Sequence, residues 1–339
     1  MKRLLIILVS SLCALSAFAE SAKTFDATYV ATLRDVPAGL KSLDVWIPLP
    51  VTRGMQTVSD VVIESPWKFT RKHDAEFGNE YGFARIAHPP AGEISVRVRF
   101  RVTRREESEE APAEKKATRA ELARALRADR LVTLSPRVRK LADEVTAGKA
   151  TTVEQAHAIF DYLVTTMKYD KTTPGWGNGD TERACDIKKG NCTDFHSLFL
   201  SLARAKGIPA RFVIGFPLTA ADGHVAGYHC WAEFYVKGRG WIPVDASDAS
   251  KLSDAGAREY LFGHLDPNRV QFTIGRDLHL TPRTAEPLNF FIYPYAEAKG
   301  ERVGVGAVAL DFRATAVRTG LSLSPHSLTS PSSGDPAPF

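Results

Sequence analysis

A cysteine in the middle of the chain stands in a setting that favours chemistry. Cys192 lies in the stretch Gly-Asn-Cys-Thr-Asp-Phe-His at residues 190–196, where a helical apolar pattern begins. Asn191 is a residue type that caps helices, which would place Cys192 in the first helical turn. Unpaired N–H groups and the helix dipole favour an anion there. Because the thiolate is the nucleophilic form, the sequence favours a nucleophile over the small buried residue that a single cysteine more often is.

A thiolate nucleophile needs a base, and His229 is the best-placed histidine for that role. It begins the segment 229–236, which turns at Lys-Gly-Arg-Gly and returns as residues 241–245. That turn brings Asp245 opposite positions 229 to 232, where a carboxylate can orient the imidazole through its second ring nitrogen. The sequence therefore predicts a nucleophile, a base and an orienting carboxylate.

Two segments resemble the signature blocks of the transglutaminase-like superfamily, within the papain-like cysteine peptidase fold. Residues 190–216 carry Gly-x-Cys-x-Asp-Phe and Gly-Ile-Pro-Ala-Arg, and residues 228–249 carry His-x-Trp-x-Glu and Gly-Trp-x-x-x-Asp. The resemblance extends from about residue 131 to residue 312 and implies the same three roles for Cys192, His229 and Asp245. It is strongest to the exported bacterial branch, in which a β domain precedes the core. The implied fold class is α+β, with a helix bundle packed on an antiparallel sheet after a small all-β sandwich.

Other residues of the expected site are less clearly marked. The backbone N–H of Cys192 is one oxyanion donor, and the second is expected from Trp176 or Tyr169, although Trp176 could equally pack as a loop residue. His196 stands where the family commonly has a small residue. It is expected to be a pocket-wall histidine, and a metal pair with Cys192 is the weaker alternative because structural zinc needs four ligands. Asp194 is expected to serve the helix cap or an internal hydrogen bond.

The cysteine count leaves three alternatives. Cys13 falls in the leader, so three cysteines remain, an odd number for an oxidising compartment. A Cys185–Cys230 disulfide would leave Cys192 free, since neighbouring strand residues point to opposite faces and Cys230 should then point away from it. Two unpaired buried thiols, or a Cys185–Cys192 disulfide that switches the protein off, remain open.

The organisation of the chain follows its composition. Lys2 and Arg3, an apolar run and a small-x-small site predict a signal peptide over residues 1–19. Residues 20–105 are expected to form the β-sandwich, residues 106–130 a charged helical linker, residues 131–315 the catalytic domain and residues 316–339 a disordered tail.

Periodicity predicts the individual elements. The clearest strand alternates over residues 94–103, with a row of arginines on its solvated face, and weaker strands are expected at 25–33, 43–48 and 58–64. Ser135 and Pro136 predict a helix start, and Thr152 with Gln155 has the spacing of a capping box. Later strands are expected at 211–216, 229–236, 241–244, near Phe272 and at 289–293.

Composition and motifs narrow the function. The net charge of +5 is mild and scattered, so nucleic-acid binding is not indicated. The expected activity is cysteine-dependent amide acyl transfer, most simply hydrolysis of peptide or carboxamide bonds. A cross-linking transglutaminase and a non-catalytic binding scaffold are the alternatives. The expected partner is a protein or peptide substrate, peptidoglycan stem peptides among them, in the periplasm or outside the cell. No cofactor, metal or stable membrane anchor is expected.

Overall fold

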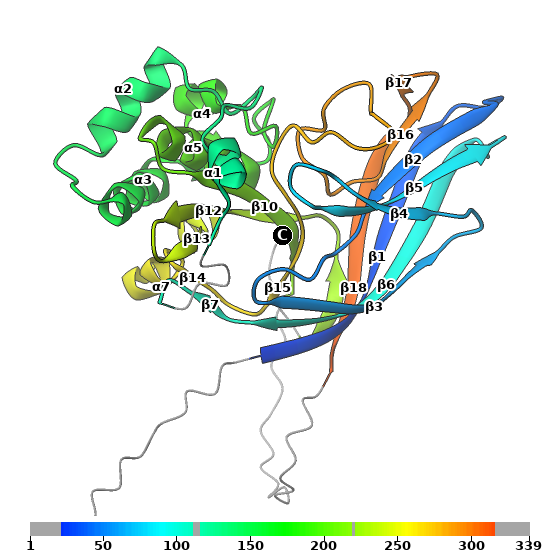
Figure 1. Cartoon of the computed structure of the whole chain (residues 1–339), viewed down its shortest axis with the longest axis horizontal. Coiled ribbons are helices and arrows are strands. Elements are labelled where there is room, and N and C mark those ends of the chain that lie inside the picture. Colours follow the sequence, from blue (N-terminus) through cyan, green and yellow to red (C-terminus); the bar gives the residue numbers. More distant parts are fainter. Residues whose placement is uncertain (1–21, 111–115, 219–220, 316–339) are drawn as a thin grey trace, which may run out of the picture.

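Helices and long strands occupy opposite sides of the molecule (Figure 1). The computed structural model describes residues 22–110, 116–218 and 221–315, so the expected signal peptide and tail lie outside the described residues. Strands β10 (Ala210–Pro217) and β15 (Arg269–Ile274) run between the two sides. None of the helices in these three ranges has the length and apolar character needed to cross a membrane.

The β-rich side consists of two five-stranded antiparallel sheets whose inner faces share one apolar core. The first sheet has the order β11-β18-β1-β6-β3, and the second has the order β17-β16-β2-β5-β4. Their strands are β1 (Ala22–Val36), β2 (Ser42–Pro48), β3 (Gln56–Glu64), β4 (Thr70–His73), β5 (Glu80–Ala87), β6 (Gly92–Arg105), β11 (Asp222–Val225), β16 (Tyr295–Ala298), β17 (Glu301–Arg302) and β18 (Val305–Thr315).

Strand β6 shows why this side folds as a sandwich. The apolar residues of its predicted alternation, from Ile94 to Val102, are all buried, and the residues between them face solvent. On the solvated face Arg99 pairs with Glu64 at 2.5 Å and Arg101 pairs with Asp26 at 2.8 Å. The arginine row is therefore a solvated face with acidic partners on neighbouring strands.

The sandwich takes strands from the part of the chain that the sequence assigned to the catalytic domain. Strand β18 pairs with β1 along its length, with Tyr29 opposite Leu310, and β11 pairs with the other edge of β18. Val308, Leu310 and Phe312 alternate into the sandwich core, and this apolar face explains why the strand joins it. The strand expected at 289–293 is not formed. That stretch is irregular, and the next strand, β16, begins at Tyr295.

The helical side covers a four-stranded antiparallel sheet of order β13-β12-β10-β15. Helix α5 packs on β12 and β10 and is buried along almost its whole length by the other helices. The remaining elements here are α1 (Arg119–Ala125), α2 (Pro136–Val145), α3 (Thr152–Thr166), α4 (Thr181–Ile187), α5 (Cys192–Ala205), α6 (Ala246–Ala249), α7 (Ala255–Tyr260), β7 (Glu107–Ser108), β8 (Lys168–Tyr169), β9 (Lys189–Gly190), β12 (His229–Val236), β13 (Gly240–Val244) and β14 (His264–Leu265).

Helix starts follow the sequence signals with one shift. Ser135 caps α2 with Pro136 as its first residue, as predicted. The capping box of α3 is formed by Thr151 and Glu154, one residue earlier than expected, because the acidic side chain can reach back to the N-cap N–H.

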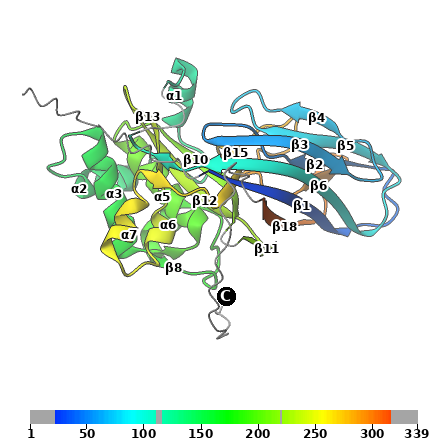
Figure 2. The ribbon, with the colours of Figure 1, turned by 90° about the horizontal axis from the view of Figure 1, so that it is seen from below.

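Two amide side chains join the sandwich to the helical side. The Asn79 side chain donates to the Ile274 carbonyl and accepts from the Ile274 N–H, both at 2.8 Å. The Gln56 side chain makes the equivalent pair with Gln271, at 2.9 and 2.7 Å. Strand β15 is the edge of its sheet, so these amides satisfy backbone groups that a further strand would otherwise pair. Figure 2 shows the sandwich and the helical side meeting at β15.

Candidate active site

Cys192 is the first residue of helix α5, and its side chain lies inside the protein. Asn191 caps the helix by accepting the Thr193 N–H at 2.9 Å, and the Asp194 carboxylate accepts the Asn191 N–H at 2.9 Å. Cys192 is 1% exposed. The sequence therefore places a thiol in the first turn of a well-capped buried helix, as the local pattern predicted.

The hairpin of β12 and β13 brings His229 and Asp245 together. Ala232 pairs with Val244, so Asp245 follows directly at the end of the returning strand and caps α6. The His229 Nε2 lies 2.7 Å from the Asp245 Oδ2, and His229 also hydrogen-bonds Cys192. Since Nε2 faces Asp245, Nδ1 is the nitrogen left for the thiol. His229 thus lies between Cys192 and Asp245 and bonds to both of the other residues named from the sequence.

Electrostatics favour an ionised pair of Cys192 and His229. The hydrogen bond from Cys230 holds the pKa of the Cys192 thiol well below its usual value, with His229 adding to this effect against the cost of burial. Burial alone would lower the pKa of His229, but the carboxylates of Asp245 and Asp248 more than offset it and raise that pKa well above its usual value. Both shifts favour a thiolate beside an imidazolium.

Asp245 has a second cationic partner that sequence reasoning missed. The Arg269 guanidinium is buried and lies 2.9 Å from the Asp245 carboxylate and 3.2 Å from Asp266. Burial would raise the pKa of Asp245, but His229 and then Arg269 hold it well below its usual range. Arg269 follows the hairpin by 24 residues on another strand, and no local pattern marks it.

The environment of Cys230 corrects one expectation. Alternation holds, since His229 shares a face with Trp231, their ring centroids being 6.5 Å apart, and Cys230 points to the other face. Helix α5, however, packs on that other face. The Cys230 sulfur therefore lies 3.8 Å from the Thr193 hydroxyl and 3.7 Å from His196 Nδ1, and it hydrogen-bonds Cys192 instead of pointing away from it.

The expected Cys185–Cys230 disulfide is not formed. Within the three described ranges Cys185, Cys192 and Cys230 are all free thiols. Cys185 belongs to α4 and lines a surface hollow beside Arg137 and Lys188, whereas Cys230 faces α5. Burial raises the pKa of Cys185 to about 11, which disfavours its thiolate form.

His196 extends from helix α5 toward Asp245. It is completely buried, and its Nε2 lies 3.6 Å from Asp245 Oδ1, too far for a hydrogen bond. Burial lowers its pKa, so it is neutral beside the charged pair. His196 is therefore a buried core residue that lines none of the cavities of the described residues, and its Nδ1 faces the sulfur of Cys230.

Of the two residues expected to supply the second oxyanion donor, Tyr169 lies near Cys192 and Trp176 does not contact it. Tyr169 lies close to the site, because the pairing of β8 with β9 sets it beside Gly190, and its ring packs on Phe195 at 6.4 Å. Trp176 is 40% exposed, and no contact of the described residues joins its indole to Cys192. A third residue, Tyr228, was missed: its hydroxyl lies 2.7 Å from the Thr193 hydroxyl and accepts from Asn191 at 3.2 Å.

A buried carboxylate fixes the glycine-rich loop against the nucleophile helix. Asp194 accepts the N–H groups of Gly177 at 2.7 Å and Gly179 at 3.1 Å, in addition to its cap contact. A Cβ at Gly179 would lie 2.3 Å from the Ser197 hydroxyl, so the close approach requires glycine. Asp194 thus serves the internal hydrogen bonds that the sequence predicted for it.

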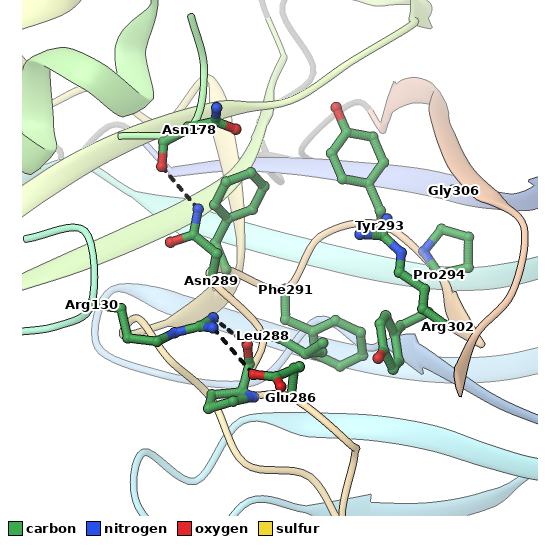
Figure 3. A pocket seen from close by; sticks show the side chains of 13 residues that line it. Arg130, Asn178, Glu286, Leu288, Asn289, Phe291, Tyr293, Pro294, Arg302 and Gly306 are labelled. Atoms are coloured by element: carbon green, nitrogen blue, oxygen red, sulfur yellow. Dashed lines mark hydrogen bonds and ion pairs between the residues drawn. The ribbon is translucent and has the colours of Figure 1, made fainter. Parts of the chain in front are cut away.

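A cavity of about 520 Å³ opens beside this loop (Figure 3). Asn178 of the loop accepts from the Asn289 side chain at 2.8 Å, and Tyr293, Phe291 and Arg302 form further walls. Tyr293 packs edge-on against Tyr228, with ring centroids 5.8 Å apart, and its pKa is raised by burial and by the nearby Cys192. Tyr293 therefore connects the cavity, through the Tyr228 ring, to the residues that flank Cys192.

Among residues 22–110, 116–218 and 221–315, one group of side chains has the spacing to hold a metal ion. The ligand atoms of His229, Asp245 and Asp248 lie within 4.8 Å of one another. Asp245 is already engaged by His229 and Arg269, so a cation would compete with both.

Comparison with known proteins agrees with this geometry. Residues 139–246, which include Cys192, His229 and Asp245, match the transglutaminase-like superfamily. The chain therefore carries a transglutaminase-like domain, and the resemblance of its signature segments is confirmed. A crystal structure of a candidate cysteine protease from Cytophaga hutchinsonii has the same fold, with a TM-score of 0.60 at 14% identity over 91% of this chain and 95% of that one. The mixed α and β architecture preceded by a β-rich region is confirmed.

Two relatives match over part of their length. An uncharacterized protein of Haemophilus influenzae is 35% identical over 197 residues, 48% of this chain and 53% of that protein. A protein-glutamine gamma-glutamyltransferase of Pseudomonas aeruginosa is 30% identical over 128 residues, 33% of this chain and 18% of that protein. The chain thus spans about half of the first relative and less than a fifth of the second.

Proposed function

We propose that this protein is a cysteine-dependent acyl-transfer enzyme that cleaves peptide or carboxamide bonds through a thioester on Cys192. The observation that carries the proposal is the contact of a helix-start thiol with a histidine that a buried carboxylate orients at 2.7 Å. In this proposal Cys192 is the nucleophile, His229 the acid and base, and Asp245 the orienting group.

The reaction follows from the charges of the pair. The Cys192 thiolate attacks the carbonyl carbon of the donor, and the C=O electron pair moves onto oxygen. The intermediate collapses, the C–N bond breaks, and the His229 imidazolium gives its proton to the departing amine. A second nucleophile then gives its proton to His229 and attacks the thioester, which releases the thiolate.

The cavity beside Tyr293 is the proposed binding space for the donor chain. Its Tyr293 wall packs on Tyr228 beside the residues that flank Cys192, and its aromatic and amide lining suits a peptide. Features of the first 19 residues support action outside the cytoplasm, where peptide substrates include the stem peptides of peptidoglycan.

A cross-linking transglutaminase is the second candidate function. It differs only in the second nucleophile, an amine in place of water. The similarity to the Pseudomonas aeruginosa gamma-glutamyltransferase over 128 residues supports it. A scaffold without activity would need no ionised thiol, and the contacts around Cys192 argue against it.

Incubation with glutaminyl and peptidoglycan-derived peptides, with and without a primary amine, tests the proposal. Mass spectrometry should detect released ammonia or a cleaved peptide bond, and the amine adduct would identify the transferase. Cys192→Ala should abolish all products, whereas Cys185→Ala, on the outer helix α4, should retain them. Equal turnover by the Cys192→Ala protein would refute the role of this cysteine.

A further inference from the structure

The Tyr228 hydroxyl lies between the side chains of the two residues that flank Cys192. Asn191 donates its amide to the phenolic oxygen at 3.2 Å, and the Thr193 hydroxyl is 2.7 Å from it. The ring is held by Phe290 and Tyr293, with centroids 5.6 and 5.8 Å away. The Tyr228 phenol, in the residue before β12, is thus held at the N-terminus of helix α5.

The first turn of that helix has one unused donor. Thr193 N–H is bonded to the Asn191 side chain, and the N–H groups of Asp194 and Phe195 are bonded to the Asn191 carbonyl. Among the hydrogen bonds of the described residues, none uses the Cys192 N–H. The helix start therefore offers this N–H to an incoming oxygen.

The hydrogen-bond partners of Tyr228 also allow its proton to stay available. The Asn191 Oδ1 accepts from Thr193 N–H, so its NH₂ group must be the donor to Tyr228. In the 2.7 Å contact of the two hydroxyls either oxygen can donate, so the Thr193 hydroxyl is able to donate to Tyr228. The phenolic oxygen then accepts two bonds, and its own proton is free for a third group.

We propose that the Tyr228 hydroxyl and the Cys192 N–H together bind the oxyanion that forms when the thiolate attacks a carbonyl. This inference rests on the proposed acyl-transfer function and assigns Tyr228 a place in it. As the Cys192 sulfur bonds to the carbonyl carbon, the C=O pair becomes a full charge on oxygen. The two donors hold that charge until the C=O bond re-forms and the leaving group departs.

Two small reagents separate this role from thiolate activation. p-Nitrophenyl acetate acylates Cys192 through an oxyanion and releases p-nitrophenolate, whereas iodoacetamide alkylates the same thiolate by displacement without one. Tyr228→Phe keeps the ring packing and removes the proton. The Tyr228→Phe change should slow acylation by about 10- to 100-fold. Removal of one oxyanion donor lowers kcat on the order of 10²–10³-fold, and an activated ester should depend on the donor less. Its alkylation rate and alkylation pH profile should match the unchanged protein.

Matched variants complete the experiment. Tyr235→Phe, at the far end of the same strand, should change neither rate. If both rates fall together in Tyr228→Phe, or neither falls, the inference is wrong. A selective loss of acylation in Tyr169→Phe instead would assign the second donor to Tyr169. Absence of any acylation in the unchanged protein would refute the proposed function itself, which distinguishes the two failures.

Discussion

At the residue scale, the site depends on how charge is shared around Asp245. This buried carboxylate contacts His229 at 2.7 Å and Arg269 at 2.9 Å, and Ser247 donates to its other oxygen at 3.2 Å. Two cationic partners favour the ionised form of this buried carboxylate, and its charge favours a protonated His229. Protonated His229 in turn stabilises the Cys192 thiolate. The reactivity of the thiol therefore depends on a residue it does not touch.

Asp245→Asn should shift the ionisation of Cys192 upward. Without the carboxylate the raised pKa of His229 falls, the imidazolium is lost at lower pH, and the thiolate loses its cation. The midpoint of the alkylation rate against pH should rise by about 1–3 units. Iodoacetamide labelling followed by peptide mass spectrometry measures it. Asp161→Asn, on the surface of α3, is the control and should leave the midpoint unchanged.

Sequence reasoning found only the residues with local signals. Cys192 follows a capping asparagine, and His229 and Asp245 belong to one hairpin, so short-range rules bring them together. Arg269 and Tyr228 act through contacts with residues distant in sequence, and neither residue type carries a marker. Cys230 was misjudged because alternation gives the two faces of a strand but not which face the helix covers.

At the element scale, Asp194 decides how the glycine-rich loop meets helix α5. One carboxylate accepts three backbone N–H groups, from Gly177, Gly179 and Asn191. Arg276, also buried, holds the loop from its other side through the Asn178 carbonyl at 3.0 Å. The loop that borders the cavity is therefore part of the rigid structure of the site.

Asp194→Asn should loosen this loop and destabilise the protein. The new NH₂ group would face N–H groups that now share a carboxylate, and it would leave buried donors unpaired. The expected loss in the free energy of unfolding is about 2–5 kcal/mol. Denaturant unfolding measures this free energy. Asp143→Asn is the control, because it makes the same change at an exposed position of α2. An unfolding free energy equal to that of the control would contradict the role given to Asp194.

Elements with strong periodicity were predictable, and irregular ones were not. The alternation of β6 and the caps of α2 and α5 are local and therefore visible in sequence. The segment at 289–293 is apolar like a strand, yet its residues line a cavity and pack on aromatic rings without forming a strand. Apolar content alone did not distinguish these two outcomes.

At the scale of the whole molecule, the two halves are joined through shared strands and amide contacts. β18, near the end of the described chain, lies between β1 and β11 in the sandwich. Asn79 and Gln56 of the sandwich then satisfy the open edge of the core strand β15. The domain boundaries expected from composition divide the chain into consecutive segments. They did not predict this arrangement, because the composition of one segment does not show which distant segment its strands pair with.

Asn79→Leu should weaken the junction between the halves. The change leaves the Ile274 N–H and carbonyl without partners in a buried position, at a cost of about 1–3 kcal/mol for each group. The melting temperature should fall by several degrees, while Gln155→Leu on the exposed face of α3 should have little effect. A melting temperature unaffected by Asn79→Leu would show that the amide does not secure the junction.

The most direct test of the central claim is the pH dependence of cysteine alkylation, read for each cysteine by peptide mapping of the unreduced protein between pH 5 and 9. The lowered pKa of Cys192 predicts that this residue labels below pH 7. Burial raises the pKa of Cys185 to about 11 and that of Cys230 well above its usual value, so both should stay unlabelled there. The labelling midpoint reports ionisation even where burial slows the rate. If Cys192 labels only above about pH 8.5, like an ordinary thiol, or is found in a disulfide, the nucleophile assigned here is wrong.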